Sequence, residues 1–318
     1  MVEKLDCFLQ VRLMGGSLRN VELSNYYEKG FVIIRNVLSE KDLLPVQVAC
    51  ENSIDGLAKK LFAQGKISSL EESCNFEDRL ARIAEQIPED EEVRNNYWGL
   101  DIMHARFPQV FKFFFNTNLL AAVESIVGSE ITLSPIQHLR PYTPKRYSKQ
   151  PFQVPWHQDL GVTFSDADKT NILTVWIPLV DVDKNNGCLQ VIPVKENIRL
   201  IEHEYRYNQV GPGIKKQSML TTKPVDCVMQ RGDVLLMNAL VPHRGQVNNS
   251  YRVRWSMDLR FQRTGTPTGR EHHPKFIVKS KKHPDSVEDN YEEWCAQWIK
   301  ALNAKNDLPN PRFKFVQD

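Results

Sequence analysis

The sequence lacks an apolar run long enough to cross a membrane, and it lacks an excess of charge of either sign. Its nearest approach, VFKFFFNTNLLAAVESIVG, is interrupted by Lys112, Asn116, Asn118 and Glu124, whereas a membrane helix needs about 18 apolar residues in a row. We therefore expect an amphipathic helix there, packed against the core. The 41 basic and 39 acidic residues give a net charge of +2, so nothing favours nucleic acid or a membrane surface as a partner.

Closely spaced cysteine pairs are also missing. The six cysteines are scattered, and no C-x-x-C pair occurs. This distribution is typical of reduced, buried thiols, which predicts an intracellular and most simply a cytoplasmic protein. The opening MVEKLDCFLQVRLMGGS carries charges where a secretion signal needs an apolar core, so we expect no signal peptide.

The pattern of apolar residues divides the 318 residues into three parts of a single domain. Residues 1–128 are mostly helical in pattern, with a short strand and then a helix whose N-cap is predicted at Ser39, facing Asp42. Residues 129–264 form short strands separated by turns, which predicts an antiparallel sandwich or barrel. Residues 265–318 are a polar extension that ends in the helical pattern DNYEEWCAQWIKALNA.

Two turn signals organise the strand region. Asn185-Asn186-Gly187 separates the apolar runs ILTVWIPLVDVD and CLQVIP. Because Asn and Gly accept positive φ at little cost, a hairpin between these two runs is expected. Arg231-Gly232-Asp233 lies within PVDCVMQRGDVLLMNALVPH and predicts a turn between two further strands rather than an adhesion motif.

His157 and Asp159 lie two positions apart in VPWHQDLG. In an extended strand, residues i and i+2 point to the same side, so an imidazole and a carboxylate can reach one metal ion. A salt bridge between them is the structural alternative. A second histidine would complete the two-His-one-carboxylate set of non-heme iron oxygenases. His243 is the best candidate because it ends the apolar run DVLLMNALVPH, although a hydrogen-bonded histidine at a strand end explains it as well.

The run YRVRWSMDLRFQ alternates between polar and apolar residues. Its polar face holds Arg252, Arg254, Ser256, Asp258 and Arg260. Polar residues along one face of a central strand are costly to bury unless that face lines a polar cavity. Since arginine binds a carboxylate with two parallel hydrogen bonds, this row predicts a site for an anion. Exposure to solvent or pairing with Asp258 is the alternative.

Taken in order, these motifs resemble the phytanoyl-CoA dioxygenase family of Fe(II)/2-oxoglutarate-dependent oxygenases. The matching features are His-x-Asp, a Gly turn before CLQVIP, GDVLLMNALVPH, and an Arg eleven positions after the second His; the opening YYEKGFVIIRNVLSEKDL is also similar. The resemblance runs from about residue 22 to about residue 262. It implies a double-stranded β-helix, or jelly roll, with helices outside, iron bound at its mouth, and 2-oxoglutarate and O2 as cosubstrates.

The resemblance also assigns roles to residues. It makes His157, Asp159 and His243 the iron ligands, and it makes Arg254 the residue that holds the far carboxylate of 2-oxoglutarate. Periodicity alone leaves Arg252 as an alternative to Arg254. The implied activity is oxidation, most simply hydroxylation, of an unactivated C–H bond of a small-molecule metabolite, as in biosynthesis, with release of succinate and CO2.

Further residues of the pocket follow from the same resemblance. Gln137 matches a Gln that lies close to the cosubstrate in relatives, and Trp176 lies near an aromatic position of that pocket, with an ordinary core residue as its alternative. Gly245 stands where many relatives carry Ser, so one side-chain hydrogen bond is missing. Arg140 and Arg260 are candidates to meet an anionic group of the substrate, with a structural salt bridge as the alternative for Arg140.

Two other functions compete with this interpretation. A cupin-like metal-dependent isomerase or hydrolase would need no 2-oxoglutarate and hence no Arg254, and a regulatory protein that had lost catalysis would not need all three metal ligands. The polar segment 142–151 before the metal motif is either a lid or an exposed loop. Natural-product or amino-acid-like metabolites are the preferred substrates, because neither a protein-docking domain nor a basic cluster for acyl-CoA phosphates is visible.

Overall fold

The computed structural model describes residues 18–87, 97–147, 154–195, 198–204 and 212–304. All strand pairs within these ranges are antiparallel. The largest sheet has the order β1-β9-β4-β11-β2-β12, with β3 also paired to β11; a second sheet has the order β10-β5-β8, and β6 pairs with β7. The bounds are β1 (Phe31–Ile34), β2 (Glu130–Leu133), β3 (His138–Tyr142), β4 (Leu173–Pro178), β5 (Leu189–Val191), β6 (His203–Glu204), β7 (Gly213–Ile214), β8 (Val225–Asp226), β9 (Val234–Asn238), β10 (His243–Gly245), β11 (Arg254–Arg263) and β12 (Phe276–Ser280).

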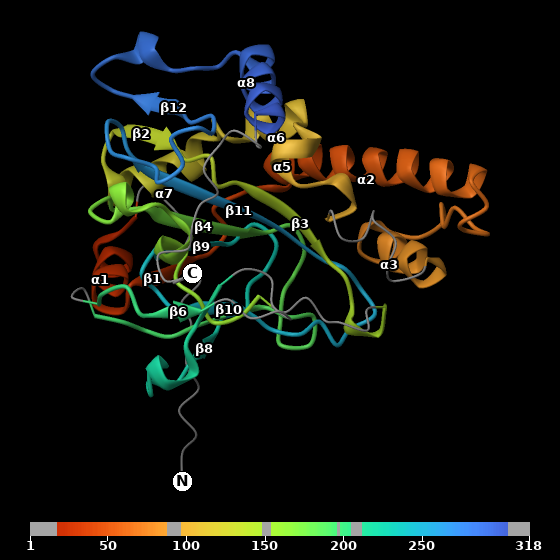
Figure 1. Cartoon of the computed structure of the whole chain (residues 1–318), viewed down its shortest axis with the longest axis horizontal. Helices are drawn as coiled ribbons and strands as arrows, with labels where there is room; N and C mark the ends of the chain where they lie inside the picture. The colour runs from red at the N-terminus through yellow and green to blue at the C-terminus, as the bar shows by residue number, and fades with distance from the viewer. Residues whose placement is uncertain (1–17, 88–96, 148–153, 196–197, 205–211, 305–318) are drawn as a thin grey trace.

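The α-helices lie mainly outside the largest sheet. Figure 1 shows α2, α3, α6 and α8 on one side of β11 and the strands β8 and β10 on the other. The helices are α1 (Asn20–Lys29), α2 (Glu40–Ala63), α3 (Phe76–Gln86), α5 (Ile102–Ala105), α6 (Pro108–Phe113), α7 (Thr117–Val127) and α8 (Tyr291–Asn303). None of the described helices is long and apolar enough to span a membrane.

The strand β11 joins the helical layer to the interior of the molecule. Trp255, on its apolar face, stacks on Phe76 of α3 with ring centroids 4.5 Å apart, and its Nε1–H donates to the Phe76 carbonyl at 3.2 Å. The other apolar residues of that face, Met257, Leu259 and Phe261, are completely buried. This packing leaves the opposite, polar face of β11 directed into the space between the two larger sheets.

The predicted hairpin around Gly187 is wrong, although the turn itself is present. Gly187 has a φ of +87°, and the N–H of Cys188 donates to the carbonyl of Asp183 at 2.8 Å. The strand before the turn, β4, pairs with β9 and β11, whereas the strand after it, β5, pairs with β8 and β10. The turn therefore carries the chain from one sheet to the other.

The helix expected over residues 110–128 is two helices. The side chain of Asn116 accepts a hydrogen bond from the N–H of Leu119 at 3.0 Å and so caps the start of α7. Asparagine favours this position because its short side chain satisfies a free N–H of the first turn. Leu119 and Val123 then face the core and are completely buried, as the amphipathic pattern predicts.

Both ends of the described chain contribute strands to the largest sheet. β1 pairs with β9, and β12 pairs with β2.

The predicted cap of α2 is confirmed, since the N–H of Ser39 donates to Asp42 at 2.7 Å. The predicted C-terminal helix is α8, which buries Trp294 and Trp298. The turn predicted at Arg231-Gly232-Asp233 is confirmed as well, with a φ of +97° at Gly232.

Candidate metal centre and adjoining cavity

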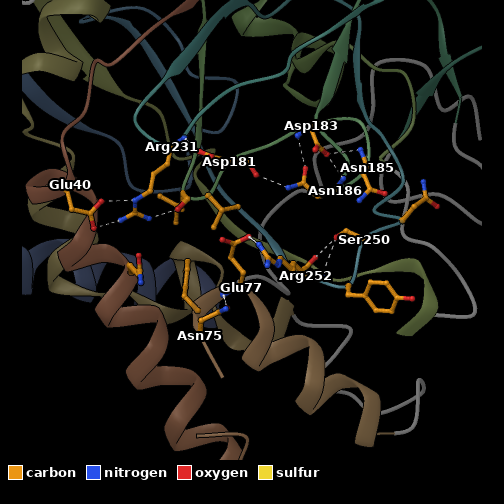
Figure 2. Close-up of a pocket in the computed structure, with 16 residues that line it drawn as sticks. Glu40, Asn75, Glu77, Asp181, Asp183, Asn185, Asn186, Arg231, Ser250 and Arg252 are labelled. Carbon is orange, nitrogen blue, oxygen red and sulfur yellow. Dashed lines mark hydrogen bonds and ion pairs between the residues drawn. The ribbon is translucent and has the colours of Figure 1, made fainter. Parts of the chain in front are cut away.

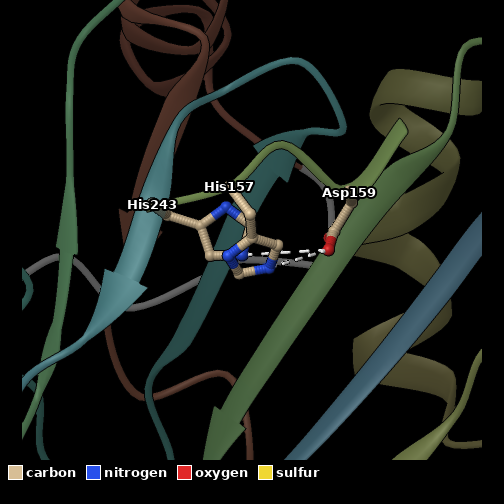
Figure 3. Close-up of side chains that lie close together, drawn as sticks. All are labelled: His157, Asp159 and His243. Atoms are coloured by element: carbon tan, nitrogen blue, oxygen red, sulfur yellow. Dashed lines mark ion pairs between the residues drawn. The ribbon is translucent and has the colours of Figure 1, made fainter. Parts of the chain in front are cut away.

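His157, Asp159 and His243 lie together in a cavity between the two larger sheets (Figure 3). Their ligand atoms, one from each residue, all lie within 4.8 Å of one another. The Nε2 atoms of His157 and His243 are 3.5 and 3.8 Å from Oδ1 of Asp159. Two imidazole nitrogens and one carboxylate oxygen so placed can contact a single metal ion from one side.

The backbone holds both imidazole rings in place. Nδ1 of His157 lies 2.9 Å from the carbonyl oxygen of Pro155, and Nδ1 of His243 lies 3.0 Å from that of Val241. Because a carbonyl only accepts, Nδ1 carries the proton in the neutral form of each ring, which leaves the lone pair of Nε2 for a metal. Burial lowers the pKa of His243 to about 4, so near pH 7 its ring is neutral, which is the form that binds a metal.

Two side chains hold the carboxylate of Asp159. Arg260 donates to Oδ1 from Nη2 at 2.8 Å and to Oδ2 from Nε at 3.3 Å, and the hydroxyl of Thr174 donates to Oδ2. Burial alone would raise the pKa of Asp159, but the neighbouring charges, that of Arg260 first, hold it well below its usual range. The carboxylate is therefore ionised and directs Oδ1 toward both histidines.

The local backbone differs from the predicted single strand. His157 exchanges backbone hydrogen bonds of 3.0 and 2.9 Å with His243, which forms an isolated bridge. Asp159 already begins a 3-10 helix, η3 (Asp159–Val162). His243 is the first residue of β10 and does not end β9, because residues 239–242 turn between the two strands. The cluster thus forms where the chain bends, not through strand alternation.

The cavity beside the cluster has a volume of about 250 Å³. Its apolar walls include Trp176 of β4, Leu189 of β5, Met237 of β9 and Val154. Trp176, Leu189 and Met237 are themselves buried, so this side of the cavity is closed by the core of both sheets. A site of this kind keeps bulk water away from whatever binds beside the metal ligands.

Arg254 lines this cavity from the start of β11. It is 6% exposed, and its Nη1–H donates to the carbonyl of Gly187 at 3.1 Å. The rings of Tyr142 and Trp176 lie beside the guanidinium, at 4.7 and 5.4 Å from its central carbon to the ring centroids. Its buried Nε has no hydrogen-bond partner among the described residues. Burial lowers the pKa of Arg254 to about 10, so it remains charged near pH 7.

Arg252 lies outside this cavity. Its side chain is 59% exposed and lies 3.5 Å from Asp78 and 3.9 Å from Glu77. It lines a separate surface pocket, shown in Figure 2, where Arg231 pairs with Glu40 at 3.0 Å. β11 begins only at Arg254, so the strand alternation that groups the two arginines does not extend to Arg252.

Of three further residues expected around the cosubstrate, two line the cavity and one is not among its described lining residues. Trp176 lines the cavity and is 3% exposed. Gly245 lines it as well, and a Cβ added there would have its nearest neighbour at 3.9 Å. Gln137 is completely buried and donates to the carbonyl of Ser134 at 2.9 Å; its two chain neighbours line the cavity, whereas Gln137 is not among the described lining residues.

The two arginines expected to meet the substrate, Arg140 and Arg260, both line the cavity. Arg140 of β3 lines the cavity opposite Ser256 of β11. Arg260 is 3% exposed and pairs with Asp258 at 3.0 Å in addition to Asp159. Its guanidinium thus has two internal carboxylate partners, but Arg260 also lines the cavity, so its contact with a substrate anion stays a prediction.

Sequence reasoning missed Thr174 and Arg270. Thr174 lies on the fully buried strand β4 and reaches Asp159 from there. Arg270 lines the same cavity from the segment after β11. No local pattern marks either residue, because only the folded arrangement of distant segments brings them to the cluster.

Comparison with known proteins identifies a family to which the chain is similar. The model of the phytanoyl-CoA dioxygenase (PhyH) family matches residues 26–256. The peroxisomal phytanoyl-CoA dioxygenase of Bos taurus is 23% identical over 247 residues, which cover 74% of this chain and 66% of the bovine protein. A probable phytanoyl-CoA dioxygenase of Caenorhabditis elegans is 21% identical over 258 residues, which cover 77% of this chain and 76% of that protein. The chain therefore spans just under two thirds of the bovine protein.

A solved structure shows the same fold. The non-heme alpha ketoglutarate dependent carbocyclase SnoK from nogalamycin biosynthesis aligns with a TM-score of 0.51 at 18% identity, covering 86% of this chain and 95% of SnoK. The predicted fold, a mainly β jelly roll with flanking helices, is confirmed by this similarity and by the antiparallel sheets.

Proposed function

Because the chain belongs to the phytanoyl-CoA dioxygenase (PhyH) family, we propose that it is an Fe(II)/2-oxoglutarate-dependent oxygenase of a small-molecule metabolite. The reaction proposed is hydroxylation of an unactivated C–H bond, with release of succinate and CO2. The observation that carries the proposal is the buried cation of Arg254 in the same cavity as His157, Asp159 and His243.

The three ligand residues fit iron. Their donor set of two imidazoles and one carboxylate is the one that non-heme Fe(II) oxygenases use, and it leaves coordination positions open for a cosubstrate and O2. His157, Asp159 and His243 would hold the ion, which would supply the redox chemistry that activates O2. The carbonyls of Pro155 and Val241 keep both rings oriented, so the protein does not have to reorganise to bind the metal.

The surroundings of Arg254 fit the distal carboxylate of 2-oxoglutarate. No carboxylate of the described residues lies within ion-pair distance of this guanidinium, and its Nε is buried without an acceptor. A buried charge is costly unless an opposite charge meets it. The rings of Tyr142 and Trp176 restrict the position of the guanidinium, so a carboxylate bound there would be oriented as well as neutralised.

The other described residues of the site position and shield the reacting groups. Arg260 and Thr174 orient Asp159, and the apolar walls exclude water from the space where a C–H bond would be oxidised. We keep Gln137 as a proposed neighbour of the cosubstrate and Arg140 as a proposed contact of the substrate. Part of the segment 142–151, considered as a lid, lies outside the described residues.

We further propose one catalytic domain formed by all 318 residues, acting on a small molecule in the cytoplasm. The scattered cysteines support the reducing location, since all five that the structure describes are free thiols. The bovine relative is, by its name, peroxisomal. The cupin-like isomerase or hydrolase without 2-oxoglutarate is the alternative, and it gives no reason for the buried charge of Arg254.

Conversion of 2-oxoglutarate to succinate tests the proposed reaction. With Fe(II), ascorbate and O2, the wild-type protein should form succinate slowly even without a substrate, which NMR of the reaction mixture measures. Asp159→Ala should lower the rate by about 100-fold or more, because a metal ligand is lost. Arg252→Ala is the matched control and should not change it. Equal rates for wild type and Asp159→Ala would refute the ligand assignment.

A further inference from the structure

Arg270 brings a further cation to the cavity of the metal centre. It lies seven positions after the end of β11 at Arg263, yet it lines the cavity that also contains His157, Asp159 and His243. Its Nη2–H donates to the carbonyl of Val162 at 2.8 Å. Its Nε is buried and has no acceptor among the described residues. No carboxylate of the described residues pairs with it.

The backbone around Arg270 is fixed against the segment that begins at Asp159. Gly269 has a φ of +66°, and a Cβ added there would lie 2.5 Å from Cβ of Thr163 and 3.0 Å from Cβ of Ala167. The N–H of Phe164 donates to the carbonyl of Gly269 at 3.2 Å. Only glycine permits this approach together with this φ. The guanidinium is therefore held at the cavity by the fold rather than placed there by a flexible surface chain.

The charges of the cavity are not balanced. Its described lining contains four arginines and two carboxylates: Arg140, Arg254, Arg260, Arg270, Asp159 and Asp258. Arg260 pairs with both of the carboxylates, at 2.8 and 3.0 Å. Under the proposed function, a divalent iron and the 2-oxoglutarate dianion add equal and opposite charge. Arg140 is left out of this balance because its charge also acts on Asp101. The other three arginines still exceed the two carboxylates by one positive charge when iron and 2-oxoglutarate are both bound, which favours an anionic substrate.

We propose that Arg270 binds a carboxylate group of the substrate, so that this enzyme acts on small carboxylic acids. The inference rests on the proposed function and names its substrate class. A carboxylate oxygen supplies the acceptor that Nε lacks, and a guanidinium binds a carboxylate with a defined orientation. The cavity has a volume of about 250 Å³ and must also hold 2-oxoglutarate, so the substrate should be a small acid with a single carboxylate group. Burial, and then the charge of Arg260, lower the pKa of Arg270 to about 10, so the group is still a cation near pH 7.

Binding of matched acids and amides tests the proposal without turnover. The protein is loaded with Zn(II), which is redox-inert, and with saturating 2-oxoglutarate. Butanoate, octanoate and phenylacetate are then titrated beside butanamide, octanamide and phenylacetamide, and saturation-transfer difference NMR measures binding. For the wild type, at least one acid should bind about tenfold or more tightly than its amide, since a hydrogen bond to a charged group is stronger than one between neutral groups.

Variants of Arg270 assign the preference to this residue. Arg270→Gln should bind acid and amide equally, and Arg270→Lys should restore part of the preference because it keeps the charge. Arg252→Gln, in the separate surface pocket, is the matched control and should retain the full preference. A preference that persists in Arg270→Gln, or the absence of any Arg270-dependent binding of all three acids, would overturn the proposal.

Binding of 2-oxoglutarate separates this inference from the proposed function. Arg270→Gln should bind 2-oxoglutarate as the wild type does, whereas Arg254→Gln should lose at least about tenfold in affinity. If the metal-loaded wild type does not bind 2-oxoglutarate, the proposed function fails. If it binds 2-oxoglutarate but does not distinguish acids from amides, only the assignment of Arg270 fails.

Discussion

Arg260 and Asp159 form an ion pair in which both side chains are 4% exposed. Such a pair contributes little net stability compared with apolar residues of the same size, but breaking it is costly because it leaves a buried charge without a partner. Here the charge left behind would be that of the proposed metal ligand. The pair therefore links the stability of the metal-free protein to the geometry of its site.

Replacing Arg260 by Met should destabilise the metal-free protein by about 3–5 kcal/mol, because Asp159 and Asp258 lose their shared cation. Denaturation by urea measures this free energy of unfolding. Zn(II) should restore part of the loss, since the ion replaces the missing positive charge beside Asp159. Arg252→Met, which removes an exposed arginine, should change stability by less than about 1 kcal/mol. Equal effects of the two substitutions would refute this role of Arg260.

Gly245 leaves room for the side chain that many relatives carry there. With the nearest atom at 3.9 Å from an added Cβ, Gly245→Ser should alter the free energy of unfolding by no more than about 0.5 kcal/mol. With its added hydroxyl, the variant should bind 2-oxoglutarate at least as tightly as the wild type does. Calorimetry with the Zn(II)-loaded proteins measures this affinity. A loss of affinity would show that the expected hydrogen bond has no place in this site.

At the scale of elements, the turn after β4 connects the fold to the cosubstrate site. The carbonyl of Gly187 accepts from Arg254, and a Cβ added at Gly187 would lie 2.6 Å from the carbonyl oxygen of Gln246. The turn therefore holds Arg254, the residue proposed to bind 2-oxoglutarate, from one side. Its neighbour β5 pairs with β10, on which His243 lies, so a shift of this turn would also reach the metal ligand.

Gly187→Ala should lower the free energy of unfolding by about 1–3 kcal/mol, because of its φ of +87° and the close backbone oxygen. It should also weaken 2-oxoglutarate binding several-fold by moving the Gly187 carbonyl away from Arg254. Gly265→Ala is a matched control, with the same φ of +87° but no atom within 4 Å. Urea denaturation and calorimetry separate the two effects. Similar weakening in the control would mean that the turn does not position Arg254.

The sequence indicates the elements better than their pairing. Asn116 explains why one predicted helix is two, since its side chain caps α7, and this local signal was available. The sequence could not show that the strands on either side of Gly187 do not pair with each other. A turn sets the bend of the chain but does not determine which strands pair beyond it. Asp159 likewise begins a 3-10 helix, although alternation placed it on a strand, and its side chain still reaches both histidines.

At the scale of the whole molecule, segments distant in the sequence build the site together. The spacing of His157, Asp159 and His243 is readable because short motifs carry it, and the cluster the structure forms contains these three residues. Arg270 has no such signal, since it follows the last strand of the motif region in a polar segment. The packing of Gly269 against Thr163 and Ala167, together with the hydrogen bond from Arg270 to the carbonyl of Val162, holds it at the cavity.

The global stability should fall with decreasing pH partly through His203. This residue is completely buried; the N–H of Gln158 donates to its Nε2 at 3.0 Å, and its Nδ1 lies 2.7 Å from the carbonyl oxygen of Ile201. Burial lowers the pKa of His203 to about 4, whereas the unfolded chain has a value of about 6.5. Between these values the unfolded state binds more protons, so the contribution of His203 is present above about pH 6.5 and decreases toward pH 4.

The contribution lost over this range is at most about 3 kcal/mol. Urea denaturation between about pH 7.5 and pH 4.5 measures it as the difference between the wild type and His203→Gln. The variant should lose less stability on acidification, because glutamine does not titrate. Other groups, including His243, titrate in both proteins and cancel in this difference. The same pH dependence in both proteins would show that His203 is not held neutral by the fold.

Anaerobic addition of Fe(II) and then 2-oxoglutarate tests whether the three-residue cluster and Arg254 form one oxygenase site. We expect a visible charge-transfer band when 2-oxoglutarate binds to iron held by His157, Asp159 and His243. Arg254→Met should raise the concentration of 2-oxoglutarate needed for the band by about tenfold or more, and Arg252→Met should leave it unchanged. Iron binding without the band would support the cupin-like alternative. No iron binding at all would mean that the cluster is a structural salt bridge and that the proposed function is wrong.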